Sequence, residues 1–125
     1  HMAKKHGADF TINTKDKDAA SKILKFTGKR KAQLVLDCVG VQPTITLGAQ
    51  LLGFDSHWTV LGMGGGKIEW QAMTTPFGSM LNMPYWGSRT ELMEVLKLAE
   101  SGRIKADVTH YHIDEVNNDQ TSNIS

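Results

Sequence analysis

The stretch that decides the fold is Leu34-Val-Leu-Asp-Cys-Val-Gly40, an apolar run that ends in glycine. Two later stretches repeat the pattern, Trp58-Thr-Val-Leu-Gly62 closely and Met80-Leu-Asn-Met-Pro-Tyr-Trp-Gly87 more loosely. Amphipathic helical segments follow the first and the third stretch. Short apolar strands that alternate with helices are typical of βαβ units and a parallel sheet. Ligands of such sheets bind beyond the carboxyl ends of the strands, where these glycines lie.

Segments on either side of these strands carry helix and turn signals. The clearest is Ser88-Arg-Thr-Glu91, a capping box that predicts a helix ended by Gly102. We also expect a helix that ends at residues 3–7, a helix from Asp16 or Asp18 to Phe26, and a helix from Pro43 to Gly53 with Ile45, Ala49 and Leu52 on its inner face. Short strands are expected at residues 10–13, 58–63 and 108–113. The strand at residues 34–39 has almost no polar alternation, which predicts that both of its faces are covered.

The composition limits the class of protein. With 125 residues, 40% of them apolar and 22% charged, the chain is expected to form one globular domain. A formal net charge of +1 argues against nucleic acid or an anionic membrane surface as a partner. No stretch reaches the roughly 18 apolar residues of a membrane span. Cys38 is the single cysteine, which fits a reducing compartment, and we expect a cytoplasmic protein.

Side chains with catalytic or metal-binding chemistry are isolated from one another in the sequence. His110 and His112 share one face of a predicted strand, but a zinc site needs a third protein ligand, so solvent-facing histidines are the better interpretation. The glycines at 62–66 match no phosphate-binding spacing and predict a flexible connection. Asp37 is expected to cap the next turn, and Cys38 is expected to be a small buried apolar residue. We therefore predict no catalytic residue and no metal ligand in this chain.

Six segments in order resemble the medium-chain dehydrogenase/reductase family, and within it the zinc-type alcohol dehydrogenases. They are Gly7-Ala-Asp-Phe-Thr-Ile-Asn13, Val35-Leu-Asp-Cys-Val-Gly40, Val60-Leu-Gly-Met63, Gly87-Ser-Arg-Thr-Glu-Leu92, Leu98-Ala-Glu-Ser-Gly-Arg-Ile104 and Ile113-Asp-Glu-Val-Asn-Asn118. Each segment alone is a weak signal, but the common order makes the resemblance specific over residues 3–118.

The resemblance implies that three segments line a cleft for NAD or NADP. Cys38, Val39 and Gly40 would flank the adenosine half of the cofactor. Leu61, Gly62 and Met63 would approach the nicotinamide ring, and Pro84, Tyr85 and Trp86 would hold its carboxamide through backbone groups. The alternative is that the apolar members of these segments belong to the core, and for this chain the two interpretations have similar weight.

The resemblance also implies parts of the family that this sequence does not match. These are a catalytic domain with Cys and His zinc ligands, the glycine-rich first turn of the cofactor domain, and the residue that selects NAD or NADP. We therefore expect a partial Rossmann-like α/β fold that lacks the first βαβ unit. Residues 1–2 are interpreted as a cloning remnant, residues 3–118 as a truncated nucleotide-binding domain, and residues 119–125 as a disordered or diverted tail.

Such a partial sheet has an open position. In the doubly wound strand order 3-2-1-4-5-6, residues 10–13 match the third strand and residues 34–39 the fourth, and two absent strands would lie between them. Either residues 10–13 move beside residues 34–39, or the bare edge pairs with another chain. We expect a homo-oligomer that associates through its sheet edges.

The leading functional hypothesis is a C-terminal cofactor-domain fragment of an NAD(P)-dependent, zinc-type alcohol dehydrogenase. The complete enzyme would pass hydride between a small alcohol or aldehyde and the nicotinamide, with zinc polarising the oxygen. This chain alone is expected to be inactive. The alternatives are a non-catalytic oligomerising or binding module and a fragment of a zinc-free quinone reductase-like family member.

Overall fold

The computed structural model describes residues 2–113 of the chain. Contacts divide the chain into two compact units, of which the first ends at Trp86 and the second begins at Gly87. The predicted tail at residues 119–125 lies outside the described residues, as do His1 and the end of the predicted domain at residues 3–118. Across residues 2–113, no helix has the length and apolar character needed to cross a membrane.

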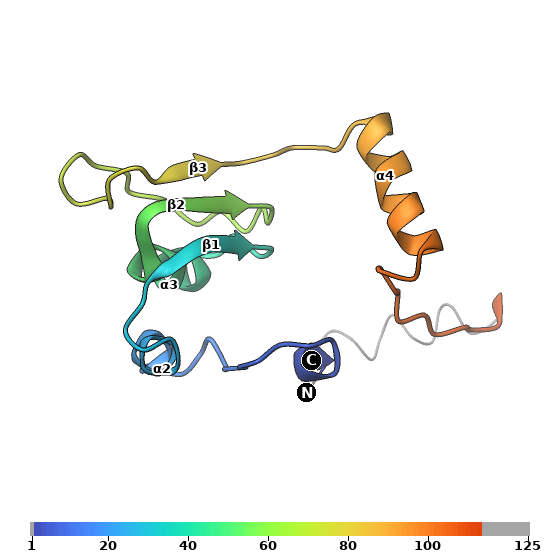
Figure 1. Cartoon of the computed structure of the whole chain (residues 1–125), viewed down its shortest axis with the longest axis horizontal. Helices are drawn as coiled ribbons and strands as arrows, with labels where there is room; N and C mark the ends of the chain where they lie inside the picture. Colours follow the sequence, from blue (N-terminus) through green and yellow to red (C-terminus); the bar gives the residue numbers. More distant parts are fainter. Residues whose placement is uncertain (1, 114–125) are drawn as a thin grey trace. The chain divides into compact units, whose positions relative to one another are not determined.

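The first unit is built on a parallel sheet with the strand order β1-β2-β3 (Figure 1). The strands are β1 at Ala32–Asp37, β2 at Leu52–Val60 and β3 at Met80–Asn82. Val35 pairs with Trp58, and Trp58 in turn pairs with Leu81. Parallel strands that follow one another along the chain need crossover connections. The predicted α/β class, with a partial Rossmann-like parallel sheet, is therefore confirmed.

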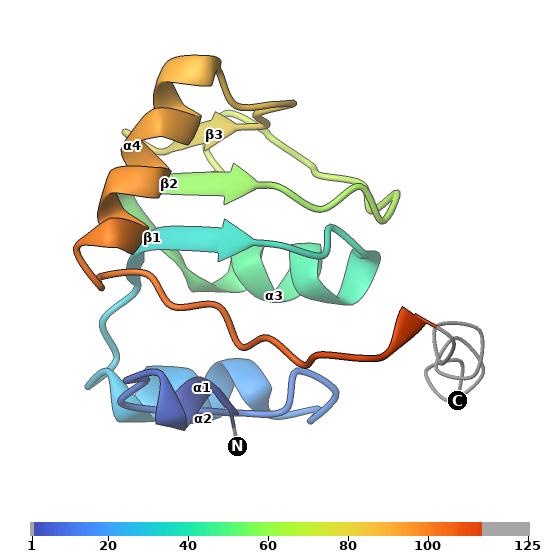
Figure 2. The same ribbon diagram turned by 90° about the vertical axis from the view of Figure 1, so that its right-hand side faces the viewer.

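Helices of the first unit flank this sheet. Helix α3, at Gln42–Leu51, lies along one face of β1 and β2 (Figure 2). Its first turn contains Pro43, as predicted. Proline suits this position because the N–H groups of the first turn have no partner within the helix, so none is lost. Helix α2, at Ala19–Phe26, contacts α3, and α1 is a single turn at Met2–Lys5. The predicted helices that end near residue 5 and at Phe26 are thus present.

The core of the first unit lies between α3 and the sheet. Its buried members are Ile45, Leu52, Trp58 and Val60, and Val35, Ile68 and Leu81 pack against them. The prediction that Ala49 faces the core is wrong, because Ala49 is exposed and Gly48 is buried instead. A Cβ atom added to Gly48 would lie 2.9 Å from the indole ring of Trp58. The helix therefore approaches β2 at a position where only glycine leaves room for tryptophan.

Only one face of β1 is covered within the first unit. The exposed fractions of Leu34 and Leu36 are 63% and 58%, whereas Val35 on the opposite face packs against the core. The prediction that both faces are covered is therefore wrong for this unit. An apolar run without alternation shows that a strand can be buried on both faces. It does not show that this unit contains a second group of residues to cover the other face.

Two predicted strands are absent from the described residues. Residues 10–13 form no strand, and Phe10 instead stacks on Phe26 of α2 with ring centroids 4.6 Å apart. The alternative that residues 10–13 pair with β1 is thus wrong for this structure. Residues 108–113 form no strand either. β-branched residues favour a strand only where a neighbouring strand accepts its hydrogen bonds, and a local pattern does not provide that neighbour.

Strand boundaries also differ from the prediction. Helix α3 ends at Leu51, and β2 begins at the next residue, so Gly53 lies inside a strand rather than at a helix end. The predicted strand at residues 58–63 ends at Val60, and the loose strand signal from Met80 to Gly87 contains only three strand residues. A glycine within a strand is unusual, and here Gly53 lies close to Lys31, where an added Cβ would be 3.0 Å from the Lys31 side chain.

The second unit contains helix α4, at Arg89–Glu100. The predicted capping box is confirmed: the Ser88 hydroxyl accepts the Glu91 N–H, and the Glu91 carboxylate accepts the Ser88 N–H. Gly102 has a φ of 73°, so the residue beyond the helix adopts the left-handed conformation that glycine tolerates. The apolar stripe of α4 is present in the sequence, but Leu92 and Leu96 are exposed.

Candidate functional site

A hollow of about 520 Å³ lies at the carboxyl ends of the three strands. Three chain segments line it: the turn after β1, the turn after β2 and the segment after β3. The lining residues are Gly40, Ile45, Val60, Leu61, Gly62, Met63, Gly65, Gly66, Ile68, Met83, Pro84, Tyr85 and Trp86. All of them belong to the first unit. The carboxyl end of a parallel sheet is the place where open α/β folds bind their ligands.

Most of the residues predicted to line a cofactor cleft meet in this hollow. Gly40, the segment Leu61-Gly-Met63 and the segment Pro84-Tyr-Trp86 all line it. Cys38 and Val39 lie in the same turn as Gly40 but do not line the hollow. The prediction that Cys38 is buried is wrong, because its side chain is exposed. The turn after β1 points the Cys38 thiol to solvent while burying Gly40.

Asp37 holds the first two segments together. Its Oδ1 atom accepts the N–H groups of Val39 at 3.0 Å and Gly40 at 2.9 Å. Its backbone carbonyl accepts the N–H groups of Leu61 at 2.8 Å and Gly62 at 3.2 Å. The side chain thus fixes the turn that follows β1, as predicted, and the main chain fixes the turn that follows β2. One buried residue at the end of β1 therefore organises both turns.

Glycines allow these two turns to touch through their backbones. A Cβ atom on Gly40 would lie 2.1 Å from the carbonyl oxygen of Gly62, and one on Gly62 would lie 2.0 Å from the carbonyl carbon of Val39. Two more hydrogen bonds join the turns, from Gly64 N–H to the Val39 carbonyl at 3.1 Å and from Gly66 N–H to the Gly40 carbonyl at 2.8 Å. Residues 62–66 are thus held in place by hydrogen bonds, whereas the sequence predicted a flexible connection.

The segment after β3 presents its backbone and two aromatic rings. Tyr85 and Trp86 are exposed, and their rings meet edge to face with centroids 5.3 Å apart. Across residues 2–113, neither Tyr85 nor Trp86 forms a backbone hydrogen bond. Their N–H and carbonyl groups at the wall of the hollow are therefore available to a ligand that carries both donors and acceptors.

The charge state of Asp37 follows from its surroundings. Burial raises the pKa of its carboxyl group, but hydrogen bonds from the Gly40 N–H, the Thr44 hydroxyl and the Val39 N–H outweigh burial, so the net pKa is lowered. The Thr44 hydroxyl has a single hydrogen and can turn it to the carboxylate or to the Val41 carbonyl, 3.0 Å away. Asp37 is thus an anion at neutral pH, held by two donors from the turn that it organises and by the Thr44 hydroxyl in the first turn of α3.

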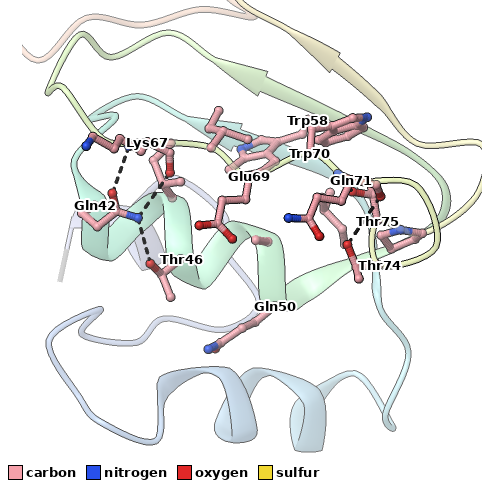
Figure 3. Close-up of a pocket in the computed structure, with 15 residues that line it drawn as sticks. Gln42, Thr46, Gln50, Trp58, Lys67, Glu69, Trp70, Gln71, Thr74 and Thr75 are labelled. Carbon is pink, nitrogen blue, oxygen red and sulfur yellow. Dashed lines mark hydrogen bonds between the residues drawn. The ribbon is translucent and has the colours of Figure 1, made fainter.

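A second hollow, of about 570 Å³, lies between α3 and residues 67–76 (Figure 3). The Gln42 side chain bridges its two walls: its amide nitrogen donates to the Lys67 carbonyl at 3.3 Å, and its Oε1 accepts the Lys67 N–H at 2.9 Å. Trp58 and Trp70 line it together with polar side chains such as Glu69. None of the predicted site residues lines this second hollow, and no sequence motif points to it.

The chain is similar to known proteins over most of its length. The sequence profile of the zinc-binding dehydrogenases matches residues 1–101. The chain belongs to the zinc-binding dehydrogenase family. It is 31% identical over 112 residues to D-arabinose 1-dehydrogenase (NADP(+)) of Saccharolobus solfataricus, covering 89% of this chain and 32% of that protein. It is 26% identical over 111 residues to an NAD-dependent alcohol dehydrogenase of Sulfurisphaera tokodaii, covering 86% and 31%.

Solved structures of this family share the fold. The alcohol dehydrogenase of Aeropyrum pernix superposes with a TM-score of 0.79 at 24% sequence identity, over 96% of this chain and 35% of that chain. The chain thus spans about a third of the length of the relatives that it matches. The predicted resemblance to the zinc-type dehydrogenases is confirmed.

Membership of the zinc-binding dehydrogenase family raises the question of which residues hold zinc. Within residues 2–113, no three or more His, Cys, Asp or Glu side chains are grouped so that they could hold a metal ion. A protein zinc site needs at least three such ligands. The side chains of the described residues therefore do not fit a zinc ion.

Proposed function

We propose that this chain forms the nicotinamide side of an NAD(P)-binding cleft in a dehydrogenase that transfers hydride between a small alcohol and its aldehyde or ketone. The observation that supports this proposal is the hollow at the carboxyl ends of β1, β2 and β3, where the predicted cofactor segments meet. Membership of the zinc-binding dehydrogenase family supports the reaction class. Because the chain spans about a third of its relatives, the substrate and the reaction belong to the whole protein.

The residues at this hollow fit a nicotinamide ring with its carboxamide. The turn after β2 presents the backbone of Gly62 at the wall of the hollow, and Met63 supplies a flexible apolar side chain beside it. Unpaired N–H and carbonyl groups of Tyr85 and Trp86 match the donor and the acceptor of a carboxamide. When bound, NAD(P) supplies the hydride acceptor or donor. The chain orients the ring and keeps water from this side of it.

We expect the described residues to give no preference between NAD and NADP. Among the relatives, one is named for NADP(+) and another is named NAD-dependent. The turns described above contact the nicotinamide half in this proposal, and that half is the same in both cofactors. We therefore expect this chain to bind NADH and NADPH with similar affinity, and we expect it to be inactive as a dehydrogenase by itself. A cytoplasmic location also stays a prediction.

Nuclear magnetic resonance of the purified chain tests the cofactor site directly. A titration with NADH, and a parallel one with NADPH, should shift the amide signals of residues 61–63 and 84–86. The indole N–H signals give an internal control, because Trp86 lines the proposed cleft and Trp70 lines only the hollow beside α3. We expect the Trp86 signal to move and the Trp70 signal to stay.

A matched pair of variants then tests the backbone contacts. Trp86→Pro removes the N–H group, whereas Trp86→Ala removes the ring and keeps the N–H. If the carboxamide is held by the backbone, the proline variant should weaken NADH binding about tenfold relative to the alanine variant, the value of roughly one hydrogen bond. Equal affinities of the two variants, or signal changes confined to α3 and residues 67–76, would contradict the proposal.

A second function is supported by the open edge of β1. Among residues 2–113, β1 pairs only with β2, so its other edge has unpaired backbone groups. Leu34 and Leu36 on this edge strand are exposed. We propose that copies of the chain associate through this edge, because an unpaired apolar strand is a template for pairing. This function does not require a cofactor, and the size of the chain in solution tests it as described in the Discussion.

A further inference from the structure

Asp37 contacts the two turns of the proposed cleft through different parts of the residue. The backbone N–H groups that the Oδ1 atom accepts belong to the turn after β1, whereas the N–H groups that the backbone carbonyl accepts belong to the turn after β2. The two turns also meet through the backbones of Gly40 and Gly62, and neither position has room for a Cβ atom. We therefore expect a change in the first turn to shift the second, although in the described residues the Asp37 side chain forms no hydrogen bond to the backbone of that second turn.

We propose that Asp37 is a positioning residue for the cofactor: its carboxylate sets the turn at residues 39–40, and through that turn it sets the backbone of residues 61–62 that faces the nicotinamide. This inference rests on the proposed cofactor function for its consequence. The coupling between the two turns is independent of the cofactor function, because it is inferred from hydrogen bonds and contacts within the chain.

Burial makes this arrangement depend on the carboxylate. Asp37 is 6% exposed, and Gly40 beside it is buried as well. Without the Oδ1 acceptor, the Gly40 N–H would have no partner in a place that water reaches poorly, and a buried unpaired N–H is unfavourable. The turn would then shift to expose this N–H. Because the Gly40 backbone touches Gly62, the turn after β2 would have to shift with it.

The coupling also involves the glycines beyond β2. Gly64 and Gly66 donate to the carbonyl groups of Val39 and Gly40, the same two residues whose N–H groups the carboxylate holds. The turn after β1 is therefore bonded on one side to Asp37 and on the other side to residues 64–66. Gly65 and Gly66 line the hollow beside Leu61 and Met63, so the shape of the proposed cleft depends on this turn.

Hydrogen exchange of individual amides tests the coupling without any ligand. In Asp37→Ala, loss of the carboxylate directly frees only the Val39 and Gly40 amides. If the turns are coupled, the amides of Leu61, Gly62 and Gly64 should also exchange roughly tenfold faster. Asp37→Asn keeps an oxygen acceptor at the same position, so it should restore slow exchange at all five amides. Faster exchange at Val39 and Gly40 alone would overturn the proposal.

A matched control separates positioning from a general loss of stability. Ser56 is fully buried on β2, and its hydroxyl bonds with that of Ser79 at 2.9 Å, away from both turns. Ser56→Ala should therefore lower the unfolding midpoint without raising exchange at Leu61 and Gly62 relative to the rest of the sheet. If Asp37→Ala does not fold, Asp37→Ser gives a graded version, because a hydroxyl accepts the same turn hydrogen bonds more weakly.

The consequence for the cofactor is measured on the same variants. Asp37→Ala, or Asp37→Ser in its place, should raise the dissociation constant for NADH about tenfold, with Asp37→Asn and Ser56→Ala close to the unaltered chain. An unaltered chain that binds neither NADH nor NADPH would refute the proposed function, while the exchange result would still decide the coupling. Equal loss of affinity in Asp37→Ala and Ser56→Ala would overturn the positioning role.

Discussion

Gly48 sets how closely α3 approaches the sheet, because the indole of Trp58 occupies the space where a side chain would begin. Glycine inside a helix normally costs about 0.5–1 kcal/mol relative to alanine. Its presence in the middle of α3 is therefore explained by packing rather than by helix propensity. Sequence periodicity could not reveal this, since the pattern of apolar residues pointed to Ala49 as the inner position.

Substitution of Gly48 tests this packing. Gly48→Ala gains helix propensity but forces a methyl group to 2.9 Å from the Trp58 ring, and overpacking costs about 1–3 kcal/mol. We expect the free energy of unfolding, measured by urea denaturation, to fall by about 1 kcal/mol. In a Trp58→Phe background the same substitution should be neutral or stabilising, because the smaller ring leaves room. A stabilising effect in both backgrounds would contradict the contact.

The carboxyl group of Asp37 makes stability depend on pH in a defined direction. Its pKa is lowered in the folded chain, so the folded state keeps the charge at a pH where the unfolded chain, with a pKa of about 3.9, binds a proton. The stabilisation is fully present above that unfolded value and is lost as the pH falls through the lower folded pKa. At neutral pH, Asp37→Asn should be less stable than the unaltered chain by about 1 kcal/mol.

Urea unfolding at a series of pH values checks this prediction. The difference between the unaltered chain and Asp37→Asn should stay constant from neutral pH to about pH 5 and should shrink below about pH 4. Asp9→Asn, which removes one exposed carboxylate, serves as a control for the general charge of the chain. A difference that grows as the pH falls would mean that the folded chain does not favour the ionised form of Asp37.

At the scale of elements, local chemistry predicted best where a segment supplies its own partners. The box at Ser88 and Glu91 satisfies both of its hydrogen bonds within four residues, and α4 begins there as predicted. The segments at residues 10–13 and 108–113 have strand-forming residues, but a strand needs a second strand, which lies elsewhere in the chain or outside it. Patterns thus identified helices more reliably than strands.

The sequence predicted which segments meet at the candidate site but not the contacts between them. Its glycine-ended strands placed Gly40, Gly62 and the segment 84–86 around one hollow, because parallel strands bring their carboxyl ends together. The sequence did not reveal that Gly40 and Gly62 touch each other, or that Asp37 bonds to both turns. Those contacts depend on the register between β1 and β2, which no local pattern specifies.

Helix α4 depends strongly on its capping box. Its leucines are exposed, and an isolated helix of this length is marginal in water, so the first-turn hydrogen bonds contribute much of its stability. Ser88→Ala should destabilise the helix by about 1 kcal/mol and lower the helical circular dichroism of the chain. Ser101→Ala is the control, since it removes a hydroxyl at the other end of α4 that bonds to the Leu98 carbonyl. Equal losses would argue against the capping box.

At the scale of the molecule, the first unit has a covered face and an uncovered one. Helix α3 and residues near Ile68 cover Trp58 and Val35, while Leu34 and Leu36 remain exposed beside the open edge of β1. Natural sheets protect such edges with charges, prolines or neighbouring elements. The exposed positions 34 and 36 of β1 hold leucines and not charged residues or prolines. We therefore expect copies of the chain to associate.

Light scattering and sedimentation test this association. The unaltered chain should form oligomers, and Leu36→Lys should shift the population toward monomer, because lysine on an edge strand opposes pairing. Met73→Lys, which places the same charge on an exposed methionine outside the sheet, is the control and should leave the oligomer unchanged. A stable monodisperse monomer at high concentration would contradict the proposed association through the edge of β1.

The burial of Trp58 also gives the chain an optical property. Its three tryptophans have exposed fractions of 1% for Trp58, 40% for Trp70 and 78% for Trp86. The emission maximum of an indole moves to longer wavelength as the ring becomes more exposed to water. The spectrum of the folded chain is therefore the sum of three components with different emission maxima. A soluble quencher such as iodide should remove the reddest component first and leave the emission of Trp58. The chain therefore carries a fluorescent reporter of its own core, which the quencher reaches only when the packing against Gly48 opens.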